Sequence, residues 1–271
     1  IRRVGHVRVF AALASFISAV LIAYPLLANP IFWSFGRIVI GFCYCGVYIT
    51  AESWLNNSVN NDKRGQALSL YMIVQMIGIV SAQGVLALGN PNGYSLFIII
   101  SILVSISFAP ILLSVSPTPA FERTKPMSLA QLFRSSPLGC VGMFLLGGVF
   151  SAQFGMSAVF GSQIGLSLSK ISLFVAAFYI GAMIFQYPIG WMSDRMDRRL
   201  LILLISASSA GGSVFAYFAG DYFFALVFAA FLVGGLSNPL YSLIIAHAND
   251  FIEYEDMASA AAGLLLSLIH I

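Results

Sequence analysis

Long apolar runs, separated by short polar breaks, make up most of the chain. Each run is about as long as the ~20 helical residues that cross a hydrocarbon core of ~30 Å. The runs are continuous and lack the alternation of a membrane β-barrel, so they predict helices, whose backbone hydrogen bonds close within the segment. The predicted helices cover residues 8–28, 31–55, 65–89, 94–115, 138–161, 170–192, 199–219 and 222–246, and a ninth begins near residue 257.

The breaks between the runs carry turn residues, as in Asn29-Pro30. The longest break, residues 116–137, is rich in proline and in charged residues and is predicted to link two halves of the protein. The predicted domains are an N-terminal half over 1–115, a cytoplasmic linker over 116–137 and a C-terminal half over 138–271. We also expect the chain to be a fragment, because it starts without Met and stops within an apolar run.

The composition supports an all-α integral membrane protein. Hydrophobic residues make up 59% of the 271 residues and charged residues only 8%, against roughly 25% charged residues in soluble proteins. So few charges cannot cover a water-soluble globule of this size. The net charge of +3 gives no reason to expect a nucleic-acid partner. The three cysteines show neither a disulfide framework nor metal spacing, and we expect no metal and no cofactor.

Basic residues cluster on one side of the predicted membrane. If consecutive runs cross in alternate directions, eleven of the 13 basic residues fall on the same side. By the positive-inside rule that side is cytoplasmic. The basic residues on this side are Arg2, Arg3, Arg8, Lys63, Arg64, Arg123, Lys125, Arg134, Arg195, Arg198 and Arg199.

The chain contains a weak internal repeat. A shift of 193 residues brings identical residues together without a gap, and six predicted spans separate the two copies. Because six is even, both copies cross the membrane in the same direction. The matching pairs are Gly41 with Gly234, Tyr48 with Tyr241, Asn56 with Asn249 and Ala67 with Ala260.

One cytoplasmic break carries a recognisable loop motif. The stretch from Gly190 to Arg199 has a Gly four residues before Asp194-Arg195, followed by the basic pair Arg198-Arg199. It resembles the loop motif of the major facilitator superfamily, although Asp197 stands where that family usually has Gly. The family's fold consists of two six-helix halves related as parallel repeats. The resemblance implies that this chain covers, incompletely, the third to the start of the eleventh helix of that fold.

Two further stretches carry the same resemblance. Arg37, Gly41 and Gly46 are similar to the Arg-and-Gly pattern of the family's fourth helix, and Arg64-Gly65-Gln66-Ala67 opens the next helix. Together with the stretch from Ala51 to Asn56, they look like the bacterial YcaD-like branch of the family. The resemblance covers essentially the whole chain.

A polar stripe is predicted on the helix over 31–55. At ~100° per residue, Arg37, Gly41, Tyr44, Tyr48 and Glu52 fall within about 80° of one another. A charge facing hydrocarbon costs ~2.5–3.5 kcal/mol, so this stripe is expected to face the bundle interior. Arg37 is the main candidate for substrate binding or coupling; the alternative is an arginine that packs or snorkels at the external end of the helix.

The resemblance implies two sets of functional residues. In the first set, Glu52 forms an ion pair with a loop arginine that locks the outward-facing state, and the candidate partners in this chain are Arg2, Arg3 and Arg64. The conformational gating candidates are Glu52, Arg64, Gly190, Asp194, Arg195, Arg198 and Arg199. The candidates for substrate binding or coupling are Arg37, Tyr44, Tyr48, Gln75, Gln153, Gln186, Asn238 and Tyr241, each of which has the alternative role of a helix-to-helix hydrogen bond.

Acidic residues follow the last complete span. For Asp250, Glu253, Glu255 and Asp256 we favour a solvated loop face over a metal site.

The functional expectation is a secondary transporter that moves a small solute by alternating access. We expect coupling to a proton or another ion, with a facilitative uniporter or a proton-linked exporter of drugs or metabolites as alternatives. An intramembrane enzyme needs paired Asp or a His-Glu-x-x-His within the spans, and a channel needs a charged ring or a filter loop; the sequence has none of these. We therefore expect a monomeric, multi-pass protein of the bacterial inner membrane that is not an enzyme.

Overall fold

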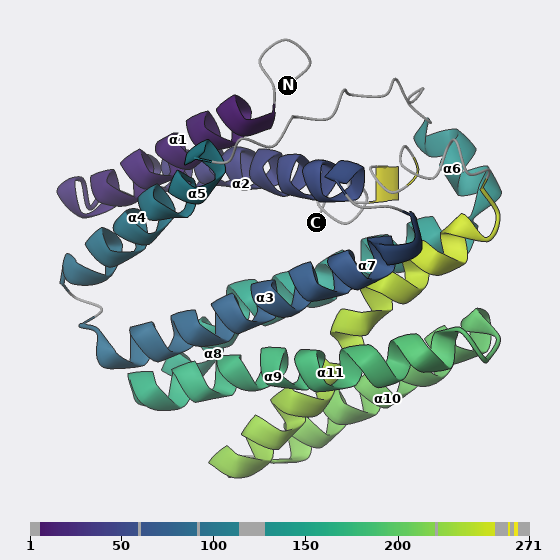
Figure 1. Ribbon diagram of the computed structural model, residues 1–271. Helices are drawn as coiled ribbons and strands as arrows, with labels where there is room; N and C mark the ends of the chain where they lie inside the picture. The colour runs from purple at the N-terminus through teal and green to yellow at the C-terminus, as the bar shows by residue number, and fades with distance from the viewer. Residues whose placement is uncertain are drawn as a thin grey trace. The chain divides into compact units, whose positions relative to one another are not determined.

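The computed structural model describes residues 6–58, 61–90, 93–113, 128–219, 222–252, 260 and 263–264. Every regular element in these ranges is helical (Figure 1). The elements are α1 (His6–Leu26), α2 (Pro30–Ser58), α3 (Asn61–Leu88), α4 (Ser95–Ser107), α5 (Ala109–Leu113), α6 (Leu129–Ser135), α7 (Pro137–Phe150), the π-helical turn η1 (Ser151–Met156), α8 (Ser157–Gln163), α9 (Leu168–Ser193), α10 (Arg198–Ala219) and α11 (Phe223–Asn249).

The described part holds seven helical segments that are long and apolar enough to cross a membrane, against eight complete runs predicted from the sequence. The predicted helix over 94–115 is instead divided into α4 and α5 at Phe108. Pro110 explains the division, because it has no N–H to donate to the carbonyl of Ile106, four residues earlier. The predicted ninth helix lies outside the described residues except for 260, 263 and 264.

The chain divides into two compact units. Unit 1 covers Ile1–Val74 and Leu88–Glu122, and unit 2 covers Gln75–Ala87 and Arg123–Ile271. The division into two six-helix halves with a linker between them stays a prediction. The short helix α6 lies within the predicted linker range, and its Leu132 is buried in unit 2.

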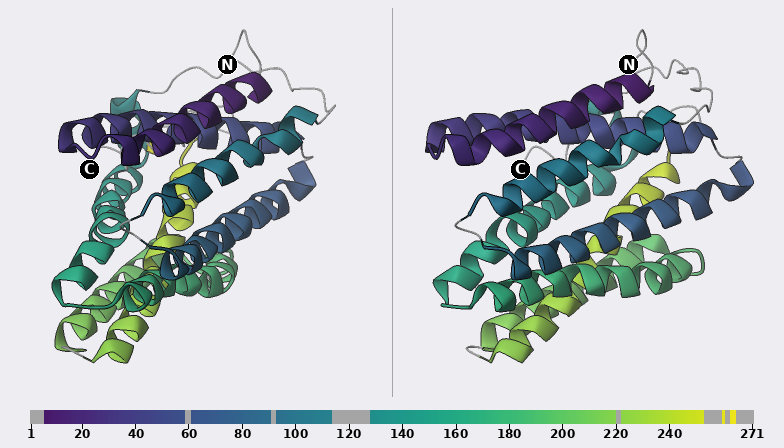
Figure 2. Two further views of the ribbon diagram at one scale, coloured as in Figure 1. Left: turned by 90° about the vertical axis from the view of Figure 1, so that its left-hand side faces the viewer. Right: turned by 60° about the vertical axis from the view of Figure 1, so that its left-hand side comes forward.

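In unit 1, α1 packs against both α2 and α4 (Figure 2). Polar contacts fix this packing, because the hydroxyl of Ser18 lies 2.7 Å from that of Ser101 and 2.8 Å from that of Ser105. The corner between α1 and α2 is closed by Trp33, whose Nε1 donates to the backbone carbonyls of Tyr24 and Leu27, each at 3.1 Å. These bonds satisfy carbonyls that the end of α1 leaves without a helical partner.

In unit 2, α7, α9 and α10 each pack against α11. The backbones of α9 and α11 nearly touch, since a Cβ added at Gly181 would lie 2.0 Å from the carbonyl oxygen of Phe231. Glycine is needed there because any side chain would force the helices apart.

Buried residues of unit 2 form two separate clusters, which we call core A and core B. Core A contains Leu132, Cys140, Met143, Leu146, Ile189, Leu201, Ile202, Ile205, Leu240, Leu243, Ile244, Ala248, Ile252, Ala260 and Leu264. Core B contains Phe174, Ala177, Phe178, Tyr179, Ala219, Leu226 and Ala230.

Candidate functional site

Buried polar side chains join the helices of unit 2 between and beside its two cores. Gln153, on η1, is only 6% exposed, and its Nε2 donates to the hydroxyl of Ser237 on α11 at 2.7 Å. The other end of the same amide, Oε1, is buried without a hydrogen-bond partner. This oxygen can therefore accept one more hydrogen bond. Leaving a buried acceptor without a partner is costly in an apolar bundle.

A second polar contact joins α9 to α11. Gln186 donates from Nε2 to the hydroxyl of Ser242 at 3.3 Å. Asn238 is 8% exposed, and its amide donates to the carbonyl of Gly234 in its own helix. Tyr241 is half-buried and packs against core A. Of the four predicted binding residues in this part of the chain, two therefore bridge helices and one binds the backbone of its own helix.

Sequence reasoning missed the two serines whose hydroxyls accept the hydrogen bonds from Gln153 and Gln186. Ser237 and Ser242 lie within the polar stretch that also holds Asn238 and Tyr241. That concentration of polar residues in one span was a usable signal, but only the tertiary structure pairs each serine with its glutamine.

The predicted stripe on α2 lies in unit 1. Arg37 and Gly41 are exposed, and so are Tyr44 and Tyr48, whose ring centroids lie 6.3 Å apart. Tyr44 also lines an apolar pocket of about 280 Å³ with residues of α1 and α4. The side chain of Glu52 lies outside the described residues. The stripe is thus one exposed face of α2. Tyr44 lies at its edge, where it borders the pocket formed with α1 and α4.

Two more of the candidates lie on α3. Gln75 is half-buried. The side chain of Arg64 lies outside the described residues. The ion pair expected between Glu52 and basic loop residues therefore stays a prediction.

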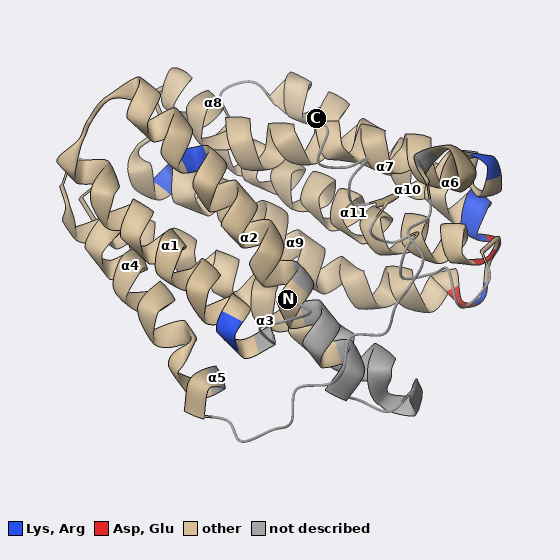
Figure 3. Cartoon of the chain, turned by 90° about the horizontal axis from the view of Figure 1, so that it is seen from above, with Lys and Arg blue, Asp and Glu red and all other residues tan. Residues whose placement is uncertain are grey.

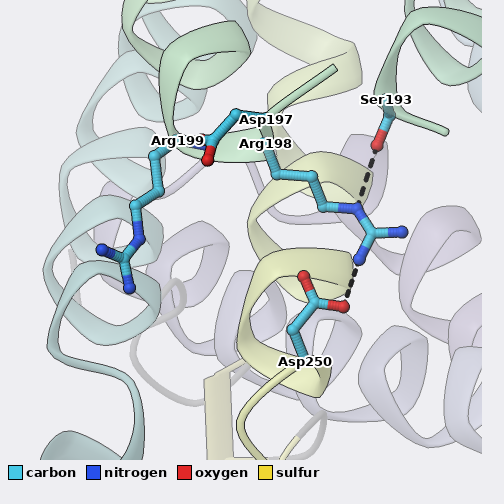
Figure 4. Close-up of polar contacts among 5 residues, drawn as sticks. All are labelled: Ser193, Asp197, Arg198, Arg199 and Asp250. Carbon is cyan, nitrogen blue, oxygen red and sulfur yellow. Dashed lines mark hydrogen bonds and ion pairs between the residues drawn. The ribbon is translucent and has the colours of Figure 1, made fainter. Parts of the chain in front are cut away.

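Charged residues gather in the loop between α9 and α10, at one end of unit 2 (Figure 3). Arg198 forms an ion pair with Asp250 at the end of α11, and its Nε donates to the hydroxyl of Ser193 at 3.3 Å (Figure 4). The side chains of the ion pair are 27% and 44% exposed, so water screens them in part. The pair ties the loop to the end of α11.

The other basic residues of the motif do not share this contact. The guanidinium of Arg195 lies over the ring of Trp191, 4.0 Å from its centroid, and that of Arg199 lies over Phe251 at 5.3 Å. Figure 4 shows Arg199 directed away from Arg198. Gly190 and Asp194 are exposed, and a Cβ added at Gly190 would have nothing within 4 Å.

Asp197 has a structural role of its own. Its Oδ1 accepts hydrogen bonds from the backbone N–H groups of Arg199 at 2.8 Å and Leu200 at 3.1 Å. It therefore caps the N-terminus of α10, where unpaired N–H groups and the helix dipole favour a carboxylate. This accounts physically for the aspartate at a position where the family motif usually has Gly.

Asp250, the described member of the expected acidic face, is exposed and also forms an ion pair. Its carboxylate is bound to Arg198, because the end of α11 lies beside the α9–α10 loop. The rest of the expected acidic cluster, residues 253, 255 and 256, lies outside the described residues. Within the described part of the chain, no three His, Cys, Asp or Glu side chains are placed to hold a metal ion.

Comparison with known proteins identifies the family. The model described as Major Facilitator Superfamily matches residues 1–269. An uncharacterized MFS-type transporter of Yersinia pestis (strain Pestoides F) is 26% identical over 240 residues, which cover 87% of this chain and 62% of the relative. The uncharacterized MFS-type transporter YcaD of Escherichia coli O17:K52:H18 is 26% identical over 274 residues, covering 98% and 69%.

Solved structures agree on the fold. A bacterial homolog of the human lysosomal transporter Spinster, in an inward-facing and occupied conformation, matches with a TM-score of 0.72 at 16% identity and covers 96% of this chain and 63% of that one. A D-xylose-proton symporter matches with a TM-score of 0.63 at 15% identity, covering 98% and 73%.

The helices and the family match define an integral membrane protein with the major facilitator fold. The chain belongs to the Major Facilitator Superfamily. The predicted family and its YcaD-like resemblance are confirmed, and so is the expectation that the chain is not an enzyme. The chain spans about three fifths of the length of the Yersinia relatives that it matches.

Proposed function

We propose that this protein is a secondary transporter that moves a small solute across the bacterial inner membrane by alternating access. The observation that carries the proposal is a buried, hydrogen-bonded amide, Gln153, inside a helical bundle of the Major Facilitator Superfamily. Polar side chains are costly within membranes and occur there mostly where they pair with one another or serve a pathway. In this proposal the polar residues of unit 2 and the stripe on α2 contact the solute.

The distribution of charge supports the proposed orientation. Among the basic residues described in unit 2, Lys170 lies at the start of α9, whereas Arg195, Arg198 and Arg199 lie in or beside the α9–α10 loop, next to the end of α11. Arg134 belongs to α6, whose Leu132 packs in core A at that same end of the unit. The positive-inside rule then puts this end in the cytoplasm.

The gating role of the loop motif is part of the same proposal. The ion pair between Arg198 and Asp250, together with Ser193, stabilises one conformation of this cytoplasmic end. In the other conformation these contacts are exchanged for water or for other partners, as in rigid-body switching. Because the pair is partly exposed, its energy is small enough to be lost in each transport cycle.

The test uses the natural full-length protein in proteoliposomes, with uptake and efflux of a mixed panel of metabolites and drugs. Each compound is followed with and without an imposed pH gradient, for the wild type and for Arg37→Ala. We expect gradient-driven movement of at least one compound and its loss in the variant. Movement without any effect of the gradient supports a uniporter instead, and unchanged gradient-driven movement in Arg37→Ala assigns Arg37 to packing.

A further inference from the structure

A buried histidine lies next to the ion pair at the end of unit 2 that the proposed orientation puts in the cytoplasm. His247 belongs to the last turn of α11 and is only 4% exposed. Three positions later on the same helix, Asp250 is exposed and holds Arg198 of α10. Positions three apart share one face of a helix. His247 therefore lies on the face of α11 that meets the start of α10.

The histidine lines a polar pocket of about 440 Å³ between the α9–α10 loop and the end of α11. The same pocket is lined by Asp194, Asp197 and Asp250, whose side chains are exposed. Water thus reaches the pocket from the proposed cytoplasmic side, although His247 itself is buried. A proton can follow the same route to the imidazole ring.

Two arginines and two aspartates face the ring of His247: Arg198, Arg199, Asp197 and Asp250. Both carboxylates already have partners, because Asp250 holds Arg198 and Asp197 accepts two backbone N–H groups of α10. The two guanidiniums would repel an imidazolium, and burial of a charge without a partner is costly. The described conformation therefore favours the neutral ring.

The other helices packed against this part of α11 supply little charge. Helix α7 contains no Asp, Glu, Lys, Arg or His, and its Cys140 is buried in core A. Asp194, which follows α9, lines the same pocket, but its side chain is exposed to water. Among the described residues, the carboxylate best placed for an imidazolium at position 247 is that of Asp250, one turn away on the same helix.

A second contact between α10 and α11 lies beside the same histidine. The ring of Phe251 meets that of His247 with centroids 5.0 Å apart, and the guanidinium of Arg199 lies over Phe251 at 5.3 Å. We call this contact and the Arg198–Asp250 ion pair the α10–α11 contacts. His247 is a neighbour of the α11 residue in each of them, so its charge state bears on both.

We propose that His247 is a proton-binding site on the cytoplasmic side of the protein, and that its protonation releases the start of α10 from the end of α11. The imidazolium takes the carboxylate of Asp250 from Arg198, and the negative end of the α11 dipole favours a cation there. Because the released conformation binds the proton more tightly, a falling pH stabilises it. This inference rests on the proposed gating role of the loop and adds that a proton controls how firmly the loop is held.

The test measures distances by spin labelling in the natural full-length protein, reconstituted in nanodiscs with all native cysteines replaced. One label pair, Met196→Cys in the loop and Leu138→Cys on α7, reports the separation of the loop from the end of α11, because the neighbouring Gly139 lies against Ala248. A control pair, Ile184→Cys and Leu138→Cys, does not include the loop. The three labelled positions are exposed, at 37%, 41% and 53% for Met196, Leu138 and Ile184.

We expect a short distance for the loop pair at pH 8 and a second, longer distance that appears as the pH falls to 5. The ratio of the two populations should change about tenfold over this range, with its midpoint between pH 5 and 8, where an imidazole titrates. A carboxylate titrates near pH 4, so the midpoint separates the two groups without any variant. The control pair should give one distance throughout.

His247→Gln keeps a polar side chain that does not titrate, and it should hold the ratio at its pH 8 value down to pH 5. The matched control is His6→Gln, which removes a histidine at the start of α1 and should keep the full response to pH. Asp250→Asn removes the ion pair itself and should already show the longer distance at pH 8.

A ratio that does not change between pH 8 and pH 5 in the wild type overturns the proposal, and so does an equal response in His247→Gln. The readout does not depend on transport. A response that requires His247, in a protein that moves no solute, supports the proton site and counts against the proposed function. Transport with a ratio that is independent of pH counts against the proton site alone.

Discussion

The close approach of α9 and α11 makes a quantitative prediction for Gly181→Ala. A Cβ at this position would lie 2.0 Å from the carbonyl oxygen of Phe231 and 3.0 Å from the backbone nitrogen of Gly235, whereas ordinary contact begins at 3.4 Å. Both neighbours are backbone atoms, so no side chain can rotate away. The two helices must therefore separate by more than an ångström at their crossing.

The cost follows from what that separation breaks. Overfilling a packed interface costs about 1–3 kcal/mol, and core B lies directly along the same two helices. A contact of 2.0 Å with a backbone oxygen puts Gly181→Ala at the upper end of this range, about 2–3 kcal/mol, and the gain in helix propensity from Gly to Ala offsets about 1 kcal/mol of it. We expect Gly181→Ala to lower the free energy of unfolding by about 1–2 kcal/mol.

Gly211→Ala is the matched control. Gly211 lies within α10, and an added Cβ there would meet nothing within 4 Å, so only the propensity gain remains. Both variants are compared with the wild type by reversible denaturation in mixed micelles, with helix content as the signal. If Gly181→Ala is as stable as the wild type or as Gly211→Ala, the backbone contact between α9 and α11 does not hold this unit together.

Two further predictions concern the cytoplasmic loop. Asp197→Ala removes the cap of α10 and should lower the free energy of unfolding by about 0.5–2 kcal/mol, whereas Asp197→Gly should lower it by only a few tenths of a kcal/mol. Equal losses for the two variants in the same denaturation assay would contradict the capping role. Arg198→Gln and Asp250→Asn should each lower the free energy of unfolding by less than about 1 kcal/mol, because the ion pair is partly exposed. A double-mutant cycle should give a coupling energy that decreases with added salt. A coupling energy of zero at low salt would show that the pair contributes nothing to stability.

Much of the fold follows from local sequence features. The run over 170–192 predicted α9, which begins at Leu168 and ends at Ser193, and the run over 199–219 predicted α10 at Arg198–Ala219. Long apolar runs must close their own hydrogen bonds in lipid, so this part of the structure needs no tertiary information. The division of α4 from α5 was also visible in principle, because Pro110 acts locally.

The π turn was not predictable in the same way. The run over 138–161 looks like one uninterrupted helix, yet the structure places η1 between α7 and α8. Nothing in the apolar pattern marks the interruption, because the pattern reports which residues avoid water and not how many residues each turn contains. The hydrogen bonds of Gln153 and Ser157, which lie at this turn, belong to the three-dimensional structure and leave no mark in the apolar pattern.

The sequence by itself determined the class of protein, the helices and the residues that carry charge or polarity within them, because helix formation in a membrane depends on composition over about twenty residues. The tertiary structure decided which of these residues meet. Gln153 and Ser237 are 84 positions apart, and Arg198 and Asp250 are 52 positions apart. Such pairs depend on where helices cross, and in unit 2 that crossing is set by glycines that allow the backbones of α9 and α11 to touch.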